Sequence, residues 1–174
     1  MWVDRASPEN VQHLIVMGVA GSGKTSVATL LAERLGVTFA EGDAFHPPAN
    51  VAKMSAGTPL TDEDRWPWLE SIRDWLTART REGVPTVVPC SALRRAYRDI
   101  LRGAEGRVRF VHLTGTPELL TARIGRRSGH FMRPAMLTSQ LATLEPLGAD
   151  EDGFAVDVEP SPGEVVDEIV AQLR

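Results

Sequence analysis

This chain of 174 residues lacks several features, and each absence excludes a class of protein. Cys90 is the only cysteine, so no internal disulfide can form. No apolar run reaches membrane-spanning length, and the first residues show neither the basic run nor the apolar core of a signal peptide. With 19 basic and 23 acidic residues, the net charge of −4 disfavours non-specific binding to nucleic acid. We therefore expect a cytoplasmic protein with no membrane or nucleic-acid partner.

The residues that are present indicate one α/β domain over residues 1–174. Hydrophobic residues make up 43% of the chain and charged residues 24%, which is ordinary for a globular domain with a real core. No linker or internal repeat divides the chain. Apolar periodicity and turn residues predict strands that alternate with helices, and hence a parallel sheet covered on both faces. The strands are predicted at 13–18, 37–40, 84–89, 107–113 and 154–158, and the helices at 24–35, 51–56, 67–81, 91–102, 116–127, 134–144 and after Ser161.

The clearest motif fits the pattern G-x-x-x-x-G-K-[ST] without a mismatch and reads Gly18-Val19-Ala20-Gly21-Ser22-Gly23-Lys24-Thr25. It follows a short apolar run and precedes an amphipathic helix, which is the context that a phosphate-binding loop requires. Glycines allow backbone N–H groups to turn inward around anionic oxygens, and the helix N-terminus points at the same place. Lys24 is predicted to contact the β- and γ-phosphates, and the Thr25 hydroxyl to bind Mg²⁺.

Asp43 follows the second predicted strand, at the edge of the sheet where ligands of open α/β proteins bind. A carboxylate at this position can orient a substrate hydroxyl and take its proton during phosphoryl transfer, or hold Mg²⁺ through water. The alternative is a local turn or helix cap. Because Asp43 should face the phosphate loop, we favour the functional interpretation.

Three basic side chains follow Asp43 in a segment that begins with a stiff loop containing Pro47 and Pro48. Arg65 is predicted to bind substrate, since a guanidinium can clamp a carboxylate with two parallel hydrogen bonds. The acidic residues before it, 62–64, are interpreted as a charged helix start. For His46 and Lys53 the residues alone leave both a substrate contact and a plain surface role open.

Two further basic segments follow. The helix predicted at 91–102 carries four arginines, most of them interpreted as a solvated face, with Ser91 and Arg98 expected to point inward. Downstream, Arg123, Arg127 and His130 lie among the glycines Gly125 and Gly129, a composition that favours a mobile lid over about 123–133. An exposed polar loop is the alternative.

Several stretches together resemble the gluconokinase family of small P-loop kinases. Besides the phosphate loop, they include Gly42-Asp-Ala-Phe-His-Pro47, Asn50-Val-Ala-Lys-Met54, Cys90-Ser-Ala-Leu93, Gly129-His-Phe-Met132 and Ser139-Gln140. The resemblance covers residues 13 to about 158. It implies a three-layer αβα fold of the nucleoside monophosphate kinase type, with a five-stranded parallel sheet in the order 2-3-1-4-5, a substrate-binding excursion at about 47–82 and a mobile lid.

The same resemblance implies ATP- and Mg²⁺-dependent phosphorylation of the 6-hydroxyl of D-gluconate by a homodimer. Asp43, Lys24 and Arg127 would be catalytic. ATP would bind residues 18–26, from Gly18 to Ser26, together with Arg123. Gluconate would contact Asp43 and the residues His46, Lys53, Arg65, Ser91, Arg98 and His130. Thr25 is the one expected metal ligand, because the third predicted strand ends in Pro89-Cys90 and offers no acidic partner.

Two other functions remain open at this point. The same fold serves other acceptors, such as shikimate, a nucleoside monophosphate or another sugar acid. A nucleotide switch that phosphorylates no metabolite is a different class. The chain lacks the Asn-Lys-x-Asp signature that selects guanine, and a substrate-side aspartate has no use in a simple switch.

Overall fold

The computed structural model describes residues 10–125 and 134–174. Its five strands are β1 (Gln12–Met17), β2 (Thr38–Phe39), β3 (Thr86–Pro89), β4 (Arg107–Thr114) and β5 (Gly153–Asp157). All pair in parallel, in the order β2-β3-β1-β4-β5. The α/β class predicted from the alternation of strands and helices is confirmed, and so is the strand order that the resemblance implied.

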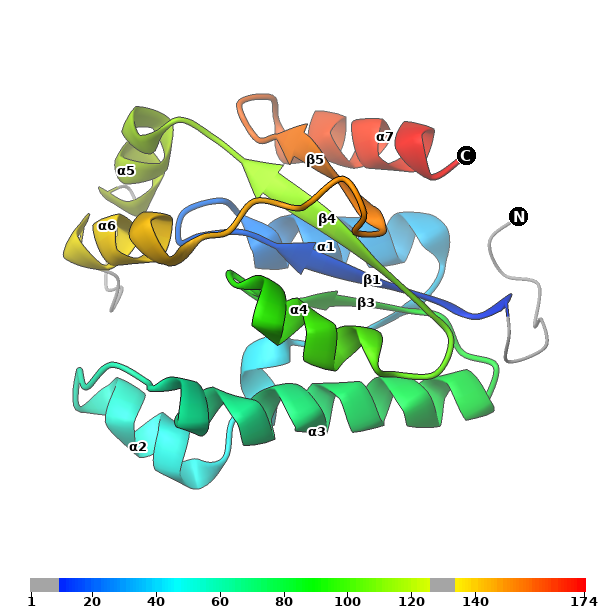
Figure 1. Cartoon of the computed structure of the whole chain (residues 1–174). Helices are drawn as coiled ribbons and strands as arrows, with labels where there is room; N and C mark the ends of the chain where they lie inside the picture. The colour runs from blue at the N-terminus through cyan, green and yellow to red at the C-terminus, as the bar shows by residue number, and fades with distance from the viewer. Residues whose placement is uncertain (1–9, 126–133) are drawn as a thin grey trace.

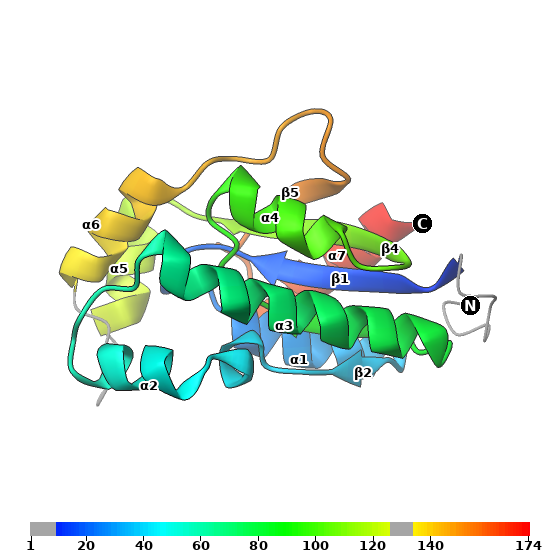
Figure 2. The same ribbon diagram turned by 60° about the horizontal axis from the view of Figure 1, so that its bottom comes forward.

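The central strand β1 is buried on both faces, which explains the apolar run from Leu14 to Met17. Leu14 and Val16 pack in one cluster with α1 (Lys24–Leu35) and α7 (Pro162–Leu173). Ile15 and Met17 pack in a second cluster with α3 (Asp62–Arg81) and α4 (Arg95–Arg102). Figures 1 and 2 show these two pairs of helices on opposite faces of the sheet.

The start of α3 differs from the sequence prediction. The Thr61 hydroxyl accepts the Asp64 N–H at 3.2 Å, and the Asp64 carboxylate accepts the Thr61 N–H at 2.9 Å. This reciprocal cap satisfies N–H groups of the first turn, so the helix begins at Asp62 and Pro67 lies inside it. The prediction placed Pro67 in the first turn and did not recognise aspartate in the place that glutamate usually takes in this cap.

Four short elements gather at the end of the sheet toward which the strands point, on the left in Figure 1. They are η2 (Gly42–Phe45), α2 (Pro48–Ser55), α5 (Pro117–Gly125) and α6 (Pro134–Thr143). The expected excursion at 47–82 consists of α2 and α3, but Leu69, Ile72 and Leu76 of α3 are fully buried core residues. Across the described residues, no helix is both long enough and apolar enough to cross a membrane.

Candidate active site

The phosphate loop joins β1 to α1, as its motif predicted. Gly21 and Gly23 have φ values of 80° and 82°, in the left-handed region that favours glycine. Gly23 occupies the N-cap of α1 and offers no side chain to the first N–H groups of the helix. These N–H groups and the helix dipole therefore point at one place on the sheet edge, where an anion is stabilised.

Inside the loop, one carbonyl oxygen collects several donors. The Val19 oxygen accepts the Ser22 N–H at 3.3 Å, the Ser22 hydroxyl at 2.7 Å and the Lys24 ammonium at 3.2 Å. The lysine side chain thus folds back over the loop that it follows. Its charge therefore lies at the Val19 carbonyl, within the loop.

Thr25 is paired with a carboxylate that the sequence analysis did not assign. Its hydroxyl donates to Glu41 Oε2 at 2.9 Å, while Glu41 Oε1 accepts the Asp43 N–H at 3.5 Å. Glu41 therefore links the expected metal ligand to the turn that carries Asp43. A signal for it existed, since Glu41 stands two residues before Asp43 at the end of the same short strand.

Asp43 is presented by a turn that is pressed against the end of β3. A Cβ at Gly42 would lie 2.2 Å from the Pro89 carbonyl oxygen, so only glycine allows this approach. The Trp68 indole N–H donates to the Gly42 oxygen at 2.8 Å and anchors the turn to α3. The Asp43 carboxylate stands at the edge of the sheet with its side chain 78% exposed, accessible to a ligand.

His46 lies beside Asp43, with 3.9 Å between Nε2 and Oδ1. Its ring stacks on Trp68 with centroids 4.2 Å apart, and its Nδ1 lies 3.1 Å from the Asn50 amide nitrogen. Burial lowers the pKa of His46, Asp43 acts in the opposite direction, and Arg65 lowers this pKa further. At neutral pH the imidazole next to Asp43 is therefore uncharged.

The thiol of Cys90, just after β3, is influenced by charges from both the phosphate loop and the turn that carries Asp43. Burial raises the pKa of its thiol to about 12, and a backbone hydrogen bond from Ala92 acts in the opposite direction. The charges of Asp43 and Glu41 raise this pKa, and the charge of Lys24 lowers it, so all three lie within electrostatic reach of one thiol. Cys90 itself is buried, with only 1% of its surface exposed.

Ser91 lies between the two sides of the site. Its carbonyl oxygen accepts the Gly18 N–H at 3.3 Å, which ties the segment after β3 to the start of the phosphate loop. Next to it, Ala92 has a φ of 45°, which is unusual for a residue with a side chain. This bend delays the start of α4 to Arg95, four residues beyond the predicted start.

Lys53 and Arg65 are both paired with acids of the α3 start. The Lys53 ammonium lies 2.7 Å from Asp64 Oδ2, and this hydrogen bond, with that from the Thr61 N–H, lowers the pKa of Asp64 to about 2. The Arg65 guanidinium lies 3.4 Å from Asp62 and 5.5 Å from the centre of the Tyr97 ring.

Asp62 was interpreted as part of a solvated charge run, and the structure shows more. Its carboxylate also accepts the Tyr97 hydroxyl at 2.5 Å and lies 3.7 Å from the Arg94 guanidinium. Two arginines therefore converge on one carboxylate near His46. The sequence analysis found Arg65 but placed Arg94 on a solvated face, because the pairing joins segments about thirty residues apart.

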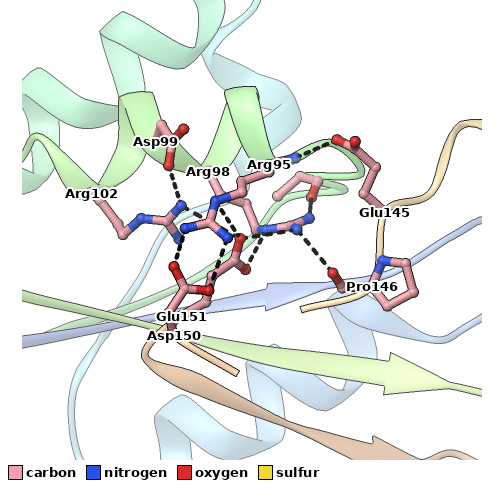
Figure 3. Close-up of polar contacts among 9 residues, drawn as sticks. Arg95, Arg98, Asp99, Arg102, Glu145, Pro146, Asp150 and Glu151 are labelled. Carbon is pink, nitrogen blue, oxygen red and sulfur yellow. Dashed lines mark hydrogen bonds and ion pairs between the residues drawn. The ribbon is translucent and has the colours of Figure 1, made fainter. Parts of the chain in front are cut away.

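Arg98 points inward as expected, but into the core and not toward a substrate. Its side chain is fully buried and its Nε donates to Glu151 Oε2 at 2.9 Å (Figure 3). It also donates to the carbonyl oxygens of Ala92 at 2.9 Å and Pro146 at 3.4 Å. Because the segment 144–151 folds back over α4, the guanidinium faces this segment and holds the Ala92 bend. We therefore do not retain Arg98 as a substrate contact.

The expected lid lies only partly within the described residues. Arg123, in the last turn of α5, donates from Nη2 to the carbonyl oxygens of Val158 and Glu159 beyond β5. Arg127 and His130 lie outside the described residues, so their predicted roles remain predictions.

A five-stranded parallel sheet in this order, with a phosphate loop after its first strand and an aspartate across the edge, defines a P-loop kinase. Residues 14–147 match the AAA domain family. The gluconokinase of Gluconobacter oxydans (strain 621H) is 53% identical over 163 residues, which are 94% of this chain and 92% of that one. The chain belongs to the gluconokinase family.

Solved structures agree with this assignment. An unliganded sugar kinase from Janibacter sp. HTCC2649 superposes with a TM-score of 0.88 at 49% identity and covers 94% of each chain. A gluconokinase from Sinorhizobium meliloti 1021 gives a TM-score of 0.82 at 46% identity, covering 97% of this chain and 93% of that one.

Proposed function

We propose that this protein transfers the terminal phosphoryl group of ATP to the 6-hydroxyl of D-gluconate, giving 6-phospho-D-gluconate and ADP. The family supports the reaction. The observation that carries it is that the Glu41 carboxylate contacts both Thr25 of the phosphate loop and the backbone N–H of Asp43, so the loop and Asp43 lie at one sheet edge. A phosphate donor and a hydroxyl acceptor can meet between them.

On the donor side, the phosphates of ATP would lie on residues 18–26, with Lys24 neutralising charge on the transferred group. The donor set of Thr25 and Glu41 is all oxygen, which fits Mg²⁺. Within the described ranges, no group of three His, Cys, Asp or Glu side chains could hold a metal ion. Mg²⁺ would thus be held by Thr25, Glu41, the phosphate oxygens and water. When bound, it would neutralise the charge that develops on the phosphates.

On the acceptor side, Asp43 would accept a hydrogen bond from the 6-hydroxyl, orient its oxygen and take the proton as the new O–P bond forms. Burial lowers the pKa of His46, so at neutral pH its imidazole is uncharged and forms no ion pair with Asp43. Arg65, with Arg94 beside it, would bind the carboxylate of gluconate at the far end of the chain. Lys53 would act through Asp64, with which it is paired.

The remaining assignments rest on the resemblance. We propose that Ser91 and His130 contact gluconate, that Arg123 contacts the nucleotide and that Arg127 in a mobile lid stabilises the transferred group. We also propose a single catalytic domain that forms a homodimer in the cytoplasm. Light scattering of the purified protein, with an expected mass near twice the 19.0 kDa of the chain, tests the dimer.

The acceptor is tested by ADP release with D-gluconate, L-idonate, shikimate and AMP, each with ATP and Mg²⁺. We expect turnover with D-gluconate far above that with the others, and no turnover in Lys24→Met. A preference for shikimate or AMP would show that the protein is a kinase with a different acceptor substrate. Tight GTP binding without turnover of any acceptor would instead favour a nucleotide switch.

A further inference from the structure

One contact of the phosphate loop comes from a helix far away in the sequence. Gln140 of α6 accepts the backbone N–H of Ala20 with its side-chain Oε1 at 2.7 Å, across 120 residues. Figure 1 shows α6 beside the loop that joins β1 to α1. Gln140 lies in one of the stretches that resemble the family, but no role was predicted for it.

The contacted N–H belongs to the same peptide group as the carbonyl that collects the donors inside the loop. The peptide bonds described are trans, so the N–H of Ala20 and the C=O of Val19 point in opposite directions. The carbonyl faces inward, toward Ser22 and the Lys24 ammonium at 3.2 Å. The N–H faces outward, toward Gln140.

The hydrogen bond at the Ala20 N–H therefore fixes the orientation of the Val19 carbonyl, and the reverse also holds. If the acceptor on α6 were lost, the buried Ala20 N–H would have no partner from that helix, and rotation of the peptide would turn the Val19 oxygen away from Lys24. Ala20 is only 3% exposed, so water does not readily replace the lost acceptor.

The adjacent residue makes the same side of the loop rigid. A Cβ at Gly21 would lie 2.8 Å from the Leu120 carbonyl oxygen and 2.9 Å from Ile124, both in α5. The backbone of the loop thus rests directly on α5 at Gly21 and is hydrogen-bonded to α6 at Ala20. Of these two contacts, the one to Gln140 is directional and sets the orientation of the peptide.

We propose that Gln140 is a positioning residue for phosphate binding: its side-chain oxygen fixes the Val19–Ala20 peptide so that the Val19 carbonyl holds Lys24 at the phosphates. The proposal rests on the proposed function only in that the loop binds a nucleotide. It does not depend on the identity of the acceptor.

The test compares Gln140→Met, which keeps the length and removes the acceptor, with Gln140→Glu, which keeps an acceptor. The matched control is Gln172→Met on α7, where the exposed glutamine donates to Glu168. Two quantities are measured without gluconate: the Kd for the non-hydrolysable analogue AMP-PNP with Mg²⁺, and the amide proton shift of Ala20 by NMR.

In Gln140→Met we expect the Kd for AMP-PNP to rise about tenfold, because losing one hydrogen bond to a buried N–H weakens binding by about that factor. We also expect the Ala20 amide proton to move upfield. In Gln140→Glu the Ala20 proton stays downfield, and Gln172→Met changes neither quantity. A purely structural role of Gln140 would lower stability and also move the Ala20 shift, but it would leave the Kd of the folded protein for AMP-PNP unchanged, so the Kd separates the two roles.

An unchanged Ala20 shift in Gln140→Met, or a Kd within twofold of the wild type, would overturn the proposal. If Gln140→Met does not fold, an upfield Ala20 shift in Gln140→Glu overturns it equally. Failure of the proposed function looks different: a different acceptor would leave AMP-PNP binding and the effect of Gln140→Met intact, and a loop that binds no ATP would show no AMP-PNP binding by the wild-type protein.

Discussion

The two sides of the candidate active site are built in different ways. The phosphate wall, residues 18–26, is made of consecutive residues and uses mainly backbone N–H groups shaped by glycines. The acceptor wall, residues 41–65, is made of side chains that pair with one another, such as Asp43 with His46 and Lys53 with Asp64. A backbone site is encoded by neighbouring letters of the sequence, whereas a side-chain network is encoded by contacts that only the fold brings together.

The largest effect is expected on the acceptor wall, from the isosteric change Asp43→Asn. The amide cannot take the hydroxyl proton, so we expect kcat with D-gluconate to fall by about 10²–10⁴-fold. The Kd for AMP-PNP should stay within about twofold of the wild type, since the phosphate wall is unchanged. Steady-state ADP release and calorimetry measure the two quantities, with Asp74→Asn on the surface of α3 as the control. A kcat close to that of the wild type would remove Asp43 from the mechanism.

The stability of the phosphate wall should be most sensitive to a side chain added at one of its tightly packed glycines. At Gly21→Ala the new methyl group meets α5 in a left-handed backbone, so we expect a loss of about 2–5 kcal/mol in the free energy of unfolding. Gly36→Ala, with φ 68° and no atom within 4 Å of the new Cβ, isolates the backbone cost of about 1–2 kcal/mol. Urea unfolding without nucleotide compares them, and equal losses would contradict the described contact with α5.

The smallest expected effect is a pH dependence of stability that comes from the acceptor wall and not from the phosphate wall. The pKa of Asp64 is held at about 2, below its ordinary value of 3.8, by Lys53 and Thr61. The stability that this pair contributes is therefore complete above about pH 4 and is lost as the pH falls toward 2. The wild type should be more stable than Asp64→Asn at pH 5, and the difference should vanish near pH 2. The phosphate wall contains no carboxylate, so it adds nothing to this dependence. A difference that stays constant over this range, measured by urea unfolding, would contradict the pairing.

The contrast between the walls also explains what the sequence could predict. The phosphate loop, the positions of Asp43 and Arg65 and the alternation of strands and helices follow from local patterns. Strand order came only from the resemblance, because periodicity does not say which strands pair. Arg98 points inward as expected, but its buried pairing with Glu151 could not be predicted because that partner lies 53 residues away. Arg94 and Gln140 were missed because each pairs with a residue on another element. Glu41 was not assigned although it stands two residues before Asp43.

The most direct test of the account is a crystal structure with AMP-PNP, Mg²⁺ and D-gluconate bound together. We predict the C6 hydroxyl oxygen within about 2.6–3.2 Å of an Asp43 carboxylate oxygen, in line with the terminal phosphorus above the phosphate loop. Gluconate bound away from this edge, or an Asp43 carboxylate turned away from the loop, would contradict the proposed reaction.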